Sequence, residues 1–429
     1  MGAEKKMPEV RFKEFSDSWK SSSLNKNIEV LDGDRGHNYP STGDLKEQGH
    51  TLFLSASNVT KRGFEFNSKQ YITLEKSQSM GNGKLALNDI VLTSRGSVGH
   101  IAWYDEIVKQ KVPYARINSG MLILRSNDSM CPSIVSQYLK SPIGARKIDL
   151  ISFGSAQPQL TKASVSKLKI TIPENKTEQS LVGSYFQKLD TLINQHQQKY
   201  DKLSNLKKAM LEKMFPKVGE TVPEIRFDGF SGEWLDSSLL ENIESIIDFR
   251  GRTPKKLGLD WSPSGYRALS ALNVKQGYID FSVDPHFGDQ ELYERWMTGS
   301  ELHKGQVLFT TEAPMGNVAQ VPDSDKYILS QRTIAFRVKS KVITEDFLAV
   351  LLRSPKVFRE LSALASGGTA KGVSQKVLSK LTVQLPACLV EQSKIGNYFQ
   401  KLDDLINQHQ QQITKLKNIK QACLDKMFV

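Results

Sequence analysis

The stretch that decides the fold occurs twice, as YFQKLDTLINQHQQKYDKLSNLKKAMLEKMF at residues 185–215 and as YFQKLDDLINQHQQQITKLKNIKQACLDKMF at residues 398–428. The copies share 22 identities in 31 positions, and the alignment continues back without a gap to Pro173 and Pro386. Apolar residues recur in both copies every three or four positions, which is the spacing of a coiled-coil seam. The sequence therefore predicts two long helices that pair with each other.

The predicted helix-pair seam uses equivalent positions of both copies. Apolar stripes are more often the core of their own domain, but the polar pentapeptide Asn-Gln-His-Gln-Gln is also repeated, at 194–198 and 407–411. Such matching favours two helices that meet across a dyad, with a histidine of each setting the register; a shared metal site is the alternative. The seam comprises Leu189, Ile193, His196, Leu203, Met210, Leu402, Ile406, His409, Leu416 and Cys423.

The remainder of each half repeats more weakly. Pro8–Phe12 returns as Pro223–Phe227, and Leu54–Val59 returns as Leu269–Val274, both offset by 215. Between these motifs lie dissimilar β-rich runs separated by Gly, Ser and Asn turns, followed by helical stretches near Pro132–Lys140 and Glu345–Leu364. We predict an α+β fold in which two variable α/β domains are separated by two long antiparallel helices that form a coiled coil with pseudo-twofold symmetry.

The expected segments follow from this duplication. They are an N-terminal segment (1–19), a first variable domain (20–175), a first long helix (176–216), a second variable domain (217–388) and a second long helix (389–429).

Charge and composition indicate the kind of partner. Lys and Arg outnumber Asp and Glu by 58 to 46, and this excess suits a polyanion whose phosphates it can neutralise. No stretch approaches the roughly 20 apolar residues of a membrane span, and the start lacks the apolar core of a secretory signal. Cys131, Cys388 and Cys423 are too few and scattered for a disulfide framework. We expect a cytoplasmic protein without membrane partners.

Motifs of catalysis are missing from the sequence. It has no phosphate-binding Gly-x-x-x-x-Gly-Lys-Ser/Thr loop, no Gly-x-Gly-x-x-Gly after a strand and no Asn/Asp-Pro-Pro-Tyr/Phe motif. Pro322–Lys326 is too contiguous for a nuclease site, and Ser164–Lys167 matches Ser-x-x-Lys without its companion motifs. The seven histidines form no cluster with the spacing of metal ligands. The sequence therefore predicts a chain that is not an enzyme and binds no metal or cofactor.

The arrangement of variable domain, helix, variable domain and matching helix resembles the specificity subunit of type I restriction–modification systems, over essentially the whole chain. The motifs that carry the resemblance are specific in combination. They are the Pro-Glu-Val/Ile-Arg-Phe segments, Phe249–Pro254, Gly154–Leu160, Gly367–Lys371, and the pairs Glu178-Gln179 and Glu391-Gln392. The first domain departs from the Gly-Arg-Thr-Pro form, with Asp34–His37 in its place, and the second has Ala370-Lys371 where the first has Ala156-Gln157.

The resemblance implies that the variable domains are target-recognition domains for double-stranded DNA. It also implies two adenine methyltransferase (modification) subunits and further motor-nuclease (restriction) subunits as partners, to which S-adenosylmethionine, ATP and magnesium would belong. A stand-alone sequence-specific DNA-binding regulator is the alternative, and it predicts tight DNA binding without partners. An enzyme with an unrecognised motif is a third class, and it predicts turnover by the purified chain alone.

Base recognition is expected from loop side chains, because Arg offers bidentate geometry to guanine and Asn or Gln to adenine. Each candidate could equally be a solvated surface charge, and phosphate contacts outnumber base contacts in such interfaces. Thirty-one helical residues span about 46 Å, against about 34 Å for a turn of DNA, so we expect a bipartite, asymmetric target with a gap set by the helices. The DNA-binding candidates are Arg35, Lys61, Arg62, Arg95, Gln157, Arg250, Arg252, Lys255, Gln331 and Lys371.

Overall fold

The computed structural model describes residues 7–154, 158–365 and 372–429. The chain divides into two compact units. Unit 1 comprises residues 1–195 and 413–429, and unit 2 comprises residues 196–412. Each unit therefore contains one of the two variable domains and about half of each long helix.

The strands of unit 1 are β1 (Lys20–Ser23), β2 (Ile28–Asp32), β3 (Thr51–Leu54), β4 (Val59–Thr60), β5 (Gly63–Phe64), β6 (Tyr71–Ile72), β7 (Ile90–Thr93), β8 (Ile101–Trp103), β9 (Ala115–Ile117), β10 (Met121–Ser126) and β11 (Lys169–Ile172). Its short helices are α1 (Leu74–Ser79), α2 (Glu106–Lys111), α3 (Pro132–Lys140), α4 (Pro142–Ile151) and α5 (Lys162–Ser166). An antiparallel sheet in the order β2-β10-β7-β8 forms the centre of the domain. A second sheet, β6-β3-β9, combines an antiparallel and a parallel pair.

Unit 2 repeats this plan. Its strands are β12 (Leu235–Ser238), β13 (Ile243–Asp248), β14 (Tyr266–Leu269), β15 (Phe287–Gly288), β16 (Val307–Thr310), β17 (Val318–Gln320), β18 (Tyr327–Leu329), β19 (Thr333–Val338) and β20 (Thr382–Leu385). Its short helices are α7 (Gln290–Met297), α8 (Glu345–Leu351), α9 (Pro355–Leu364) and α10 (Gln375–Leu378). The sheet β13-β19-β16-β17 corresponds to the central sheet of unit 1, and β15-β14-β18 corresponds to the second.

The predicted helical stretch Glu345–Leu364 is divided in the structure. Ser354 has an extended backbone, and Pro355 occupies the first turn of α9. Because the residue before a proline is pushed out of the helical region, α8 ends and α9 begins in a new direction. The same Ser-Pro pair separates α3 from α4 in unit 1.

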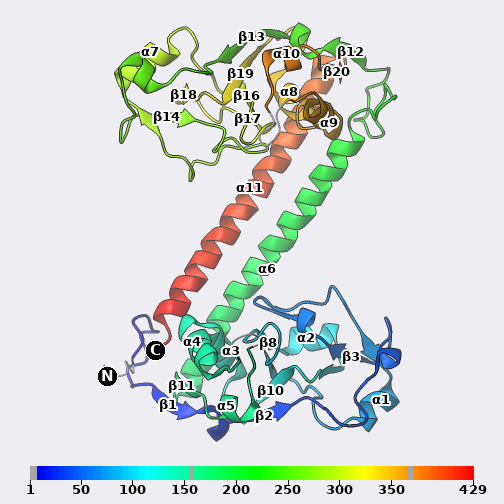
Figure 1. Ribbon diagram of the computed structural model, residues 1–429, viewed down its shortest axis with the longest axis vertical. Coiled ribbons are helices and arrows are strands. Elements are labelled where there is room, and N and C mark those ends of the chain that lie inside the picture. Colours follow the sequence, from blue (N-terminus) through cyan, green and yellow to red (C-terminus); the bar gives the residue numbers. More distant parts are fainter. Residues whose placement is uncertain (1–6, 155–157, 366–371) are drawn as a thin grey trace. The chain divides into compact units, whose positions relative to one another are not determined.

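The long helices are α6 (Lys176–Lys213) and α11 (Leu389–Lys426), coloured green and red in Figure 1. They lie antiparallel in both units. In unit 1, the Tyr185 hydroxyl lies 3.6 Å from the Cys423 sulfur, and in unit 2 the Nδ1 atoms of His196 and His409 lie 3.0 Å apart. Two α/β domains and an antiparallel pair of long helices are therefore confirmed.

Apolar seam residues lie within the core of each unit. Leu189 is buried with Leu424 and Phe428 in unit 1, and Leu416 and Cys423 pack against the same cluster. In unit 2, Leu402 is buried, and Leu203 and Met210 pack beside it. The two remaining seam positions, Ile193 and Ile406, are half-buried.

A buried ion pair joins the first residues of each half to the start of its long helix. Glu178 of α6 accepts from Arg11 at 2.6 Å and from the Trp19 indole at 3.1 Å. Glu391 of α11 accepts from Arg226 at 2.6 Å in the same way. The repeated Arg and Glu motifs of the sequence are therefore the two ends of one contact, made once in each unit.

Candidate nucleic-acid interface

Loops from four parts of the domain converge in unit 1. Arg35 follows β2 and donates to Asp32 at 3.1 Å and to the carbonyl of Ser119 at 3.3 Å. Arg95, in the loop between β7 and β8, donates its backbone N–H to Gly120 and forms a bridge with Gln159. We call residues 33–36, 94–99, 118–120 and 158–159 loop cluster 1. It places the exposed side chains of Arg35 and Arg95 on one edge of the domain.

Unit 2 has an equivalent loop cluster 2, made of residues 249–252, 311–316, 330–332 and 372–374. The Arg250 guanidinium donates to the carbonyl of Val373 at 3.3 Å, and the Val373 N–H donates to Thr311. Thr311 in turn donates to the carbonyl of Arg332, the residue after Gln331. Arg250 and Gln331, two candidates predicted from segments that are distant in the sequence, therefore lie in one cluster.

Arg250 is held in a fixed orientation. Its guanidinium pairs with Asp248 at 2.5 Å, and Gln375 donates to the same carboxylate at 3.3 Å. Burial alone would raise the pKa of Asp248, but the hydrogen bonds and charge of Arg250 outweigh burial and lower it. The carboxylate therefore stays ionised and orients a cation that is still about a third exposed.

Arg252 belongs to loop cluster 2, whereas the remaining described candidates, Lys61, Arg62 and Lys255, lie apart from both clusters. Lys61 and Arg62 are exposed in the turn between β4 and β5. Arg252 donates to the carbonyl of Trp296 at 2.8 Å, and its guanidinium lies 4.6 Å from the centre of the Phe249 ring, so it contributes to packing. Lys255 is exposed in the short 3-10 helix Pro254–Leu257. Gln157 and Lys371 lie outside the described residues.

Within residues 7–154, 158–365 and 372–429, no three His, Cys, Asp or Glu side chains are grouped so that they could hold a metal ion. Among the helices of these ranges, none has the length and apolar character to cross a membrane.

Two domains with dissimilar, cation-bearing loop clusters on a duplicated helical frame match a known family. The model of the type I restriction modification DNA specificity domain matches residues 17–205 and 290–418. The chain belongs to this family.

Relatives and a solved structure agree with the assignment to the specificity family. The type I restriction enzyme MjaVIII specificity subunit of Methanocaldococcus jannaschii is 25% identical over 274 residues, 62% of this chain and 63% of that protein, so the match spans less than two thirds of the relative. The putative MjaX specificity subunit of the same organism is 22% identical over 385 residues, 86% of this chain and 83% of the relative. The crystal structure of a type-I restriction-modification system S subunit from M. genitalium shares the fold, with a TM-score of 0.69, 13% identity and 99% of both chains covered.

In this specificity-family chain, one aspartate of each long helix links three elements. Asp190 of α6 pairs with Lys420 of α11 at 2.5 Å and accepts from Gln137 of α3 at 3.1 Å. Asp403 of α11 pairs with Lys207 of α6 and with Arg353, which follows α8. Each recognition domain is thereby tied to both helices of its own unit.

Sequence reasoning missed these carboxylates and several cations. Arg332 pairs with Glu312 at 3.3 Å inside loop cluster 2, and Lys140 and Lys420 approach each other from distant segments of unit 1. A search for candidates at identical places of both copies of the duplication would have identified Asp190 and Asp403. Lys140 and Arg353 also hold equivalent places, as the cations next to the repeated Ser-Pro pairs.

Proposed function

We propose that the chain is the sequence-specific DNA-recognition subunit of a type I restriction–modification complex, and that it performs no chemistry itself. The main support for this proposal is that the framework of the two units is duplicated, whereas the side chains of their loop clusters differ. The frame of each unit is the same, but loop cluster 1 presents Arg35 and Arg95, whereas loop cluster 2 presents Arg250 and Gln331. Different side chains on one frame suit two different half-sites, and therefore an asymmetric, bipartite target.

The two long helices would act as the spacer between the half-sites. A helix of 38 residues, the length of α6 and of α11, is about 57 Å long, compared with about 34 Å for one turn of B-DNA. Several base pairs between the half-sites would then remain uncontacted, and the length of the helices would set their number.

Partner subunits would dock on the duplicated helices. Leu192 of α6 and Leu405 of α11 hold equivalent positions, and their side chains are 42% and 43% exposed. The large apolar side chains of a helix usually face a core instead of solvent. Equivalent apolar positions in both helices support two copies of one partner, which we propose are adenine methyltransferase subunits, followed by motor-nuclease subunits. S-adenosylmethionine, ATP and magnesium would be bound by those partners, and the complex would act in the cytoplasm.

The direct test is a map of methylated adenines in DNA from cells that produce this chain together with a methyltransferase subunit. We expect one bipartite, asymmetric target whose methylation requires the chain. A continuous or palindromic target would contradict an arrangement in which two different domains each bind one half-site. Tight, specific DNA binding by the isolated chain, with no effect on methylation, would instead indicate a stand-alone regulator.

A further inference from the structure

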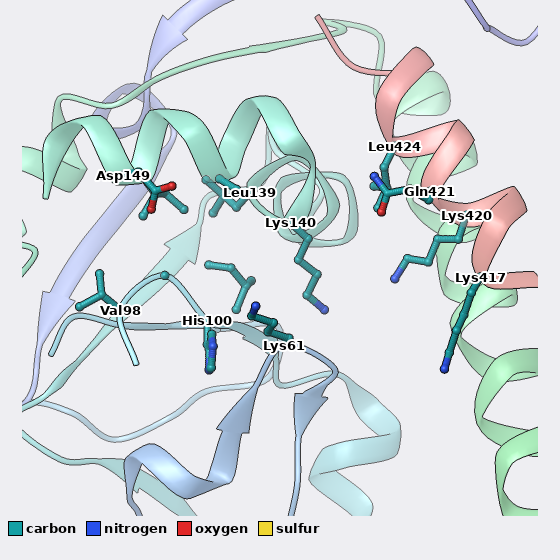
Figure 2. A pocket seen from close by; sticks show the side chains of 14 residues that line it. Lys61, Val98, His100, Leu139, Lys140, Asp149, Lys417, Lys420, Gln421 and Leu424 are labelled. Carbon is teal, nitrogen blue, oxygen red and sulfur yellow. The ribbon is translucent and has the colours of Figure 1, made fainter. Parts of the chain in front are cut away.

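A lysine-lined cavity of about 660 Å3 opens in unit 1 between the recognition domain and α11. Lys61 enters from the β4–β5 turn, Lys140 from the end of α3, and Lys417 and Lys420 from α11. Figure 2 shows that Lys61, Lys140 and Lys420 end in the same open space, with Lys417 at its outer rim. Among the described residues that line the cavity, Asp149 is the one with a carboxylate.

The cations of this cavity are incompletely neutralised. Asp190 pairs with Lys420 at 2.5 Å and its charge also acts on Lys140, so two ammonium groups share this carboxylate. Burial lowers the pKa of Lys140 to about 8; the charge of Lys420 adds to this shift, while Asp190 and Asp105 oppose it. Bringing ammonium groups together costs free energy, and an anion between them would recover it.

Unit 2 offers an internal comparison, because the same framework is built there with a larger side chain at one position. His100 borders the cavity and contacts the carbonyl of Val59, just as Asn317 donates to Val274. In unit 2, however, Phe358 stands at the place of Ala145, and its ring lies against Gly316 so closely that a Cβ there would be 2.8 Å from it. At this place in unit 1, Ala145 of α4 therefore leaves open the space that the Phe358 ring of α9 occupies in unit 2.

The cavity adjoins loop cluster 1. Val98, which lines it, lies in the same β7–β8 loop as Arg95. Asp149 lies in the last turn of α4, close in sequence to Phe153, which forms a bridge with Gln159. A ligand that crosses the loop cluster could therefore also reach the lysines.

We propose that this cavity is a phosphate-binding site, in which Lys140 and Lys420 face the phosphate and Lys61 and Lys417 border it. Four lysines line this pre-formed cavity. Their ammonium groups act as compact positive point charges, which suit the negative charge of a phosphate group. Identifying the ligand as DNA rests on the proposed function. In that case, the bound phosphate is a phosphodiester of the DNA backbone that runs past loop cluster 1. Such a contact fixes the position of the domain without reading a base.

The first arm of the test uses the full chain, without DNA, and inorganic phosphate at constant ionic strength. Phosphate should raise the unfolding temperature of the wild-type chain, because a ligand that binds only the folded state stabilises it. Ala145→Phe, which copies Phe358 of unit 2, should remove this response. Lys417→Gln, an exposed substitution that does not depend on repacking, should weaken it. Leu150→Phe places the same ring on α4 outside the cavity and should respond like the wild type.

The second arm measures DNA affinity against salt concentration for the same variants. Loss of one backbone contact should lower the slope of log K against log salt by about 0.9. We expect this decrease for Ala145→Phe and Lys417→Gln, with equal losses on target and unrelated DNA, and none for Leu150→Phe.

The two arms separate the possible failures. A lost phosphate response with an unchanged salt slope would show that the site takes a free phosphate compound and would overturn DNA as its source. An identical phosphate response in Ala145→Phe and the wild-type chain would overturn the site itself. A wild-type chain that binds phosphate, but whose complex with the methyltransferase subunit binds no DNA, would count against the proposed function and leave the phosphate site intact.

Discussion

The Nδ1 atoms of His196 and His409 lie 3.0 Å apart, so one imidazole donates this hydrogen bond and the other must accept it with a neutral nitrogen. The two histidines hold equivalent positions of α6 and α11, 213 residues apart. Protonation of both rings would replace the hydrogen bond by repulsion. The contact therefore couples the pairing of the helices to pH.

The first prediction concerns this pH dependence. Burial, the charge of His196 and the charge of Lys199 lower the pKa of His409 below its usual 6.5. A histidine with a lowered pKa in the folded state contributes stability that is complete above the unfolded pKa and is lost as the pH falls through the folded value. We therefore expect the midpoint temperature of thermal unfolding to decrease as the pH is lowered below about 6.5. His409→Asn should flatten this part of the profile; an unchanged profile would rule out the histidine pair as its cause.

The second prediction compares the two aspartates that link helices and domains. The Asp403 side chain is 7% exposed and pairs with two cations, whereas the Asp190 side chain is 34% exposed. Asp403→Asn leaves Lys207 and Arg353 without their carboxylate, which should cost about 3–5 kcal/mol of unfolding free energy. Asp190→Asn should cost less, because water can solvate its partners. Denaturant titrations of both variants measure the difference, and equal losses would contradict it.

The third prediction concerns the repeated arginine–glutamate contact. Arg226→Met would leave Glu391, whose side chain is 1% exposed, without its cation, at a cost of about 3–5 kcal/mol. Replacing both residues by apolar ones, Arg226→Met with Glu391→Leu, should restore most of the loss, because no buried charge remains. A double variant as unstable as Arg226→Met would show that the hydrogen bonds, and not the unpaired carboxylate, dominate.

The fourth prediction separates contacts with DNA from contacts within the domain. Arg95→Gln changes an exposed side chain of loop cluster 1, so stability should stay within about 0.5 kcal/mol while DNA affinity falls. Arg252→Ala should lower stability, because this guanidinium binds the Trp296 carbonyl and stacks on Phe249. DNA binding and thermal unfolding measured on both variants distinguish the two roles. A destabilised Arg95→Gln variant would contradict its assignment to the surface.

Much of the frame could be predicted from the sequence, because it is written twice. Heptad spacing predicted α6 and α11, and α3 has the bounds of the predicted helical stretch Pro132–Lys140. The break at Ser354-Pro355 was missed because the apolar pattern continues through the proline, although its missing N–H ends the helix. The predicted segment boundaries and DNA contacts remain predictions.

The lysine-lined cavity could not be predicted in this way. Lys140 and Lys420 are separated by most of the chain, and each alone resembles any solvated helix lysine. Ala145 becomes informative only when its position is compared with that of Phe358 in a shared framework. Pairwise chemistry of this kind depends on tertiary contacts that no local pattern encodes.

The spacer role of the helices is the central claim, and a paired insertion tests it most directly. Four residues added between Gln197 and Gln198 of α6, and four between Asn407 and Gln408 of α11, would lengthen the pair by about 6 Å, or roughly two base pairs. Methylated adenines mapped in cells that carry this variant and a methyltransferase subunit should show both half-sites unchanged and the gap about two base pairs longer. A four-residue insertion after the exposed Gly219 should leave the gap as it was. An unchanged gap, or an altered half-site, in the helix variant would contradict the account.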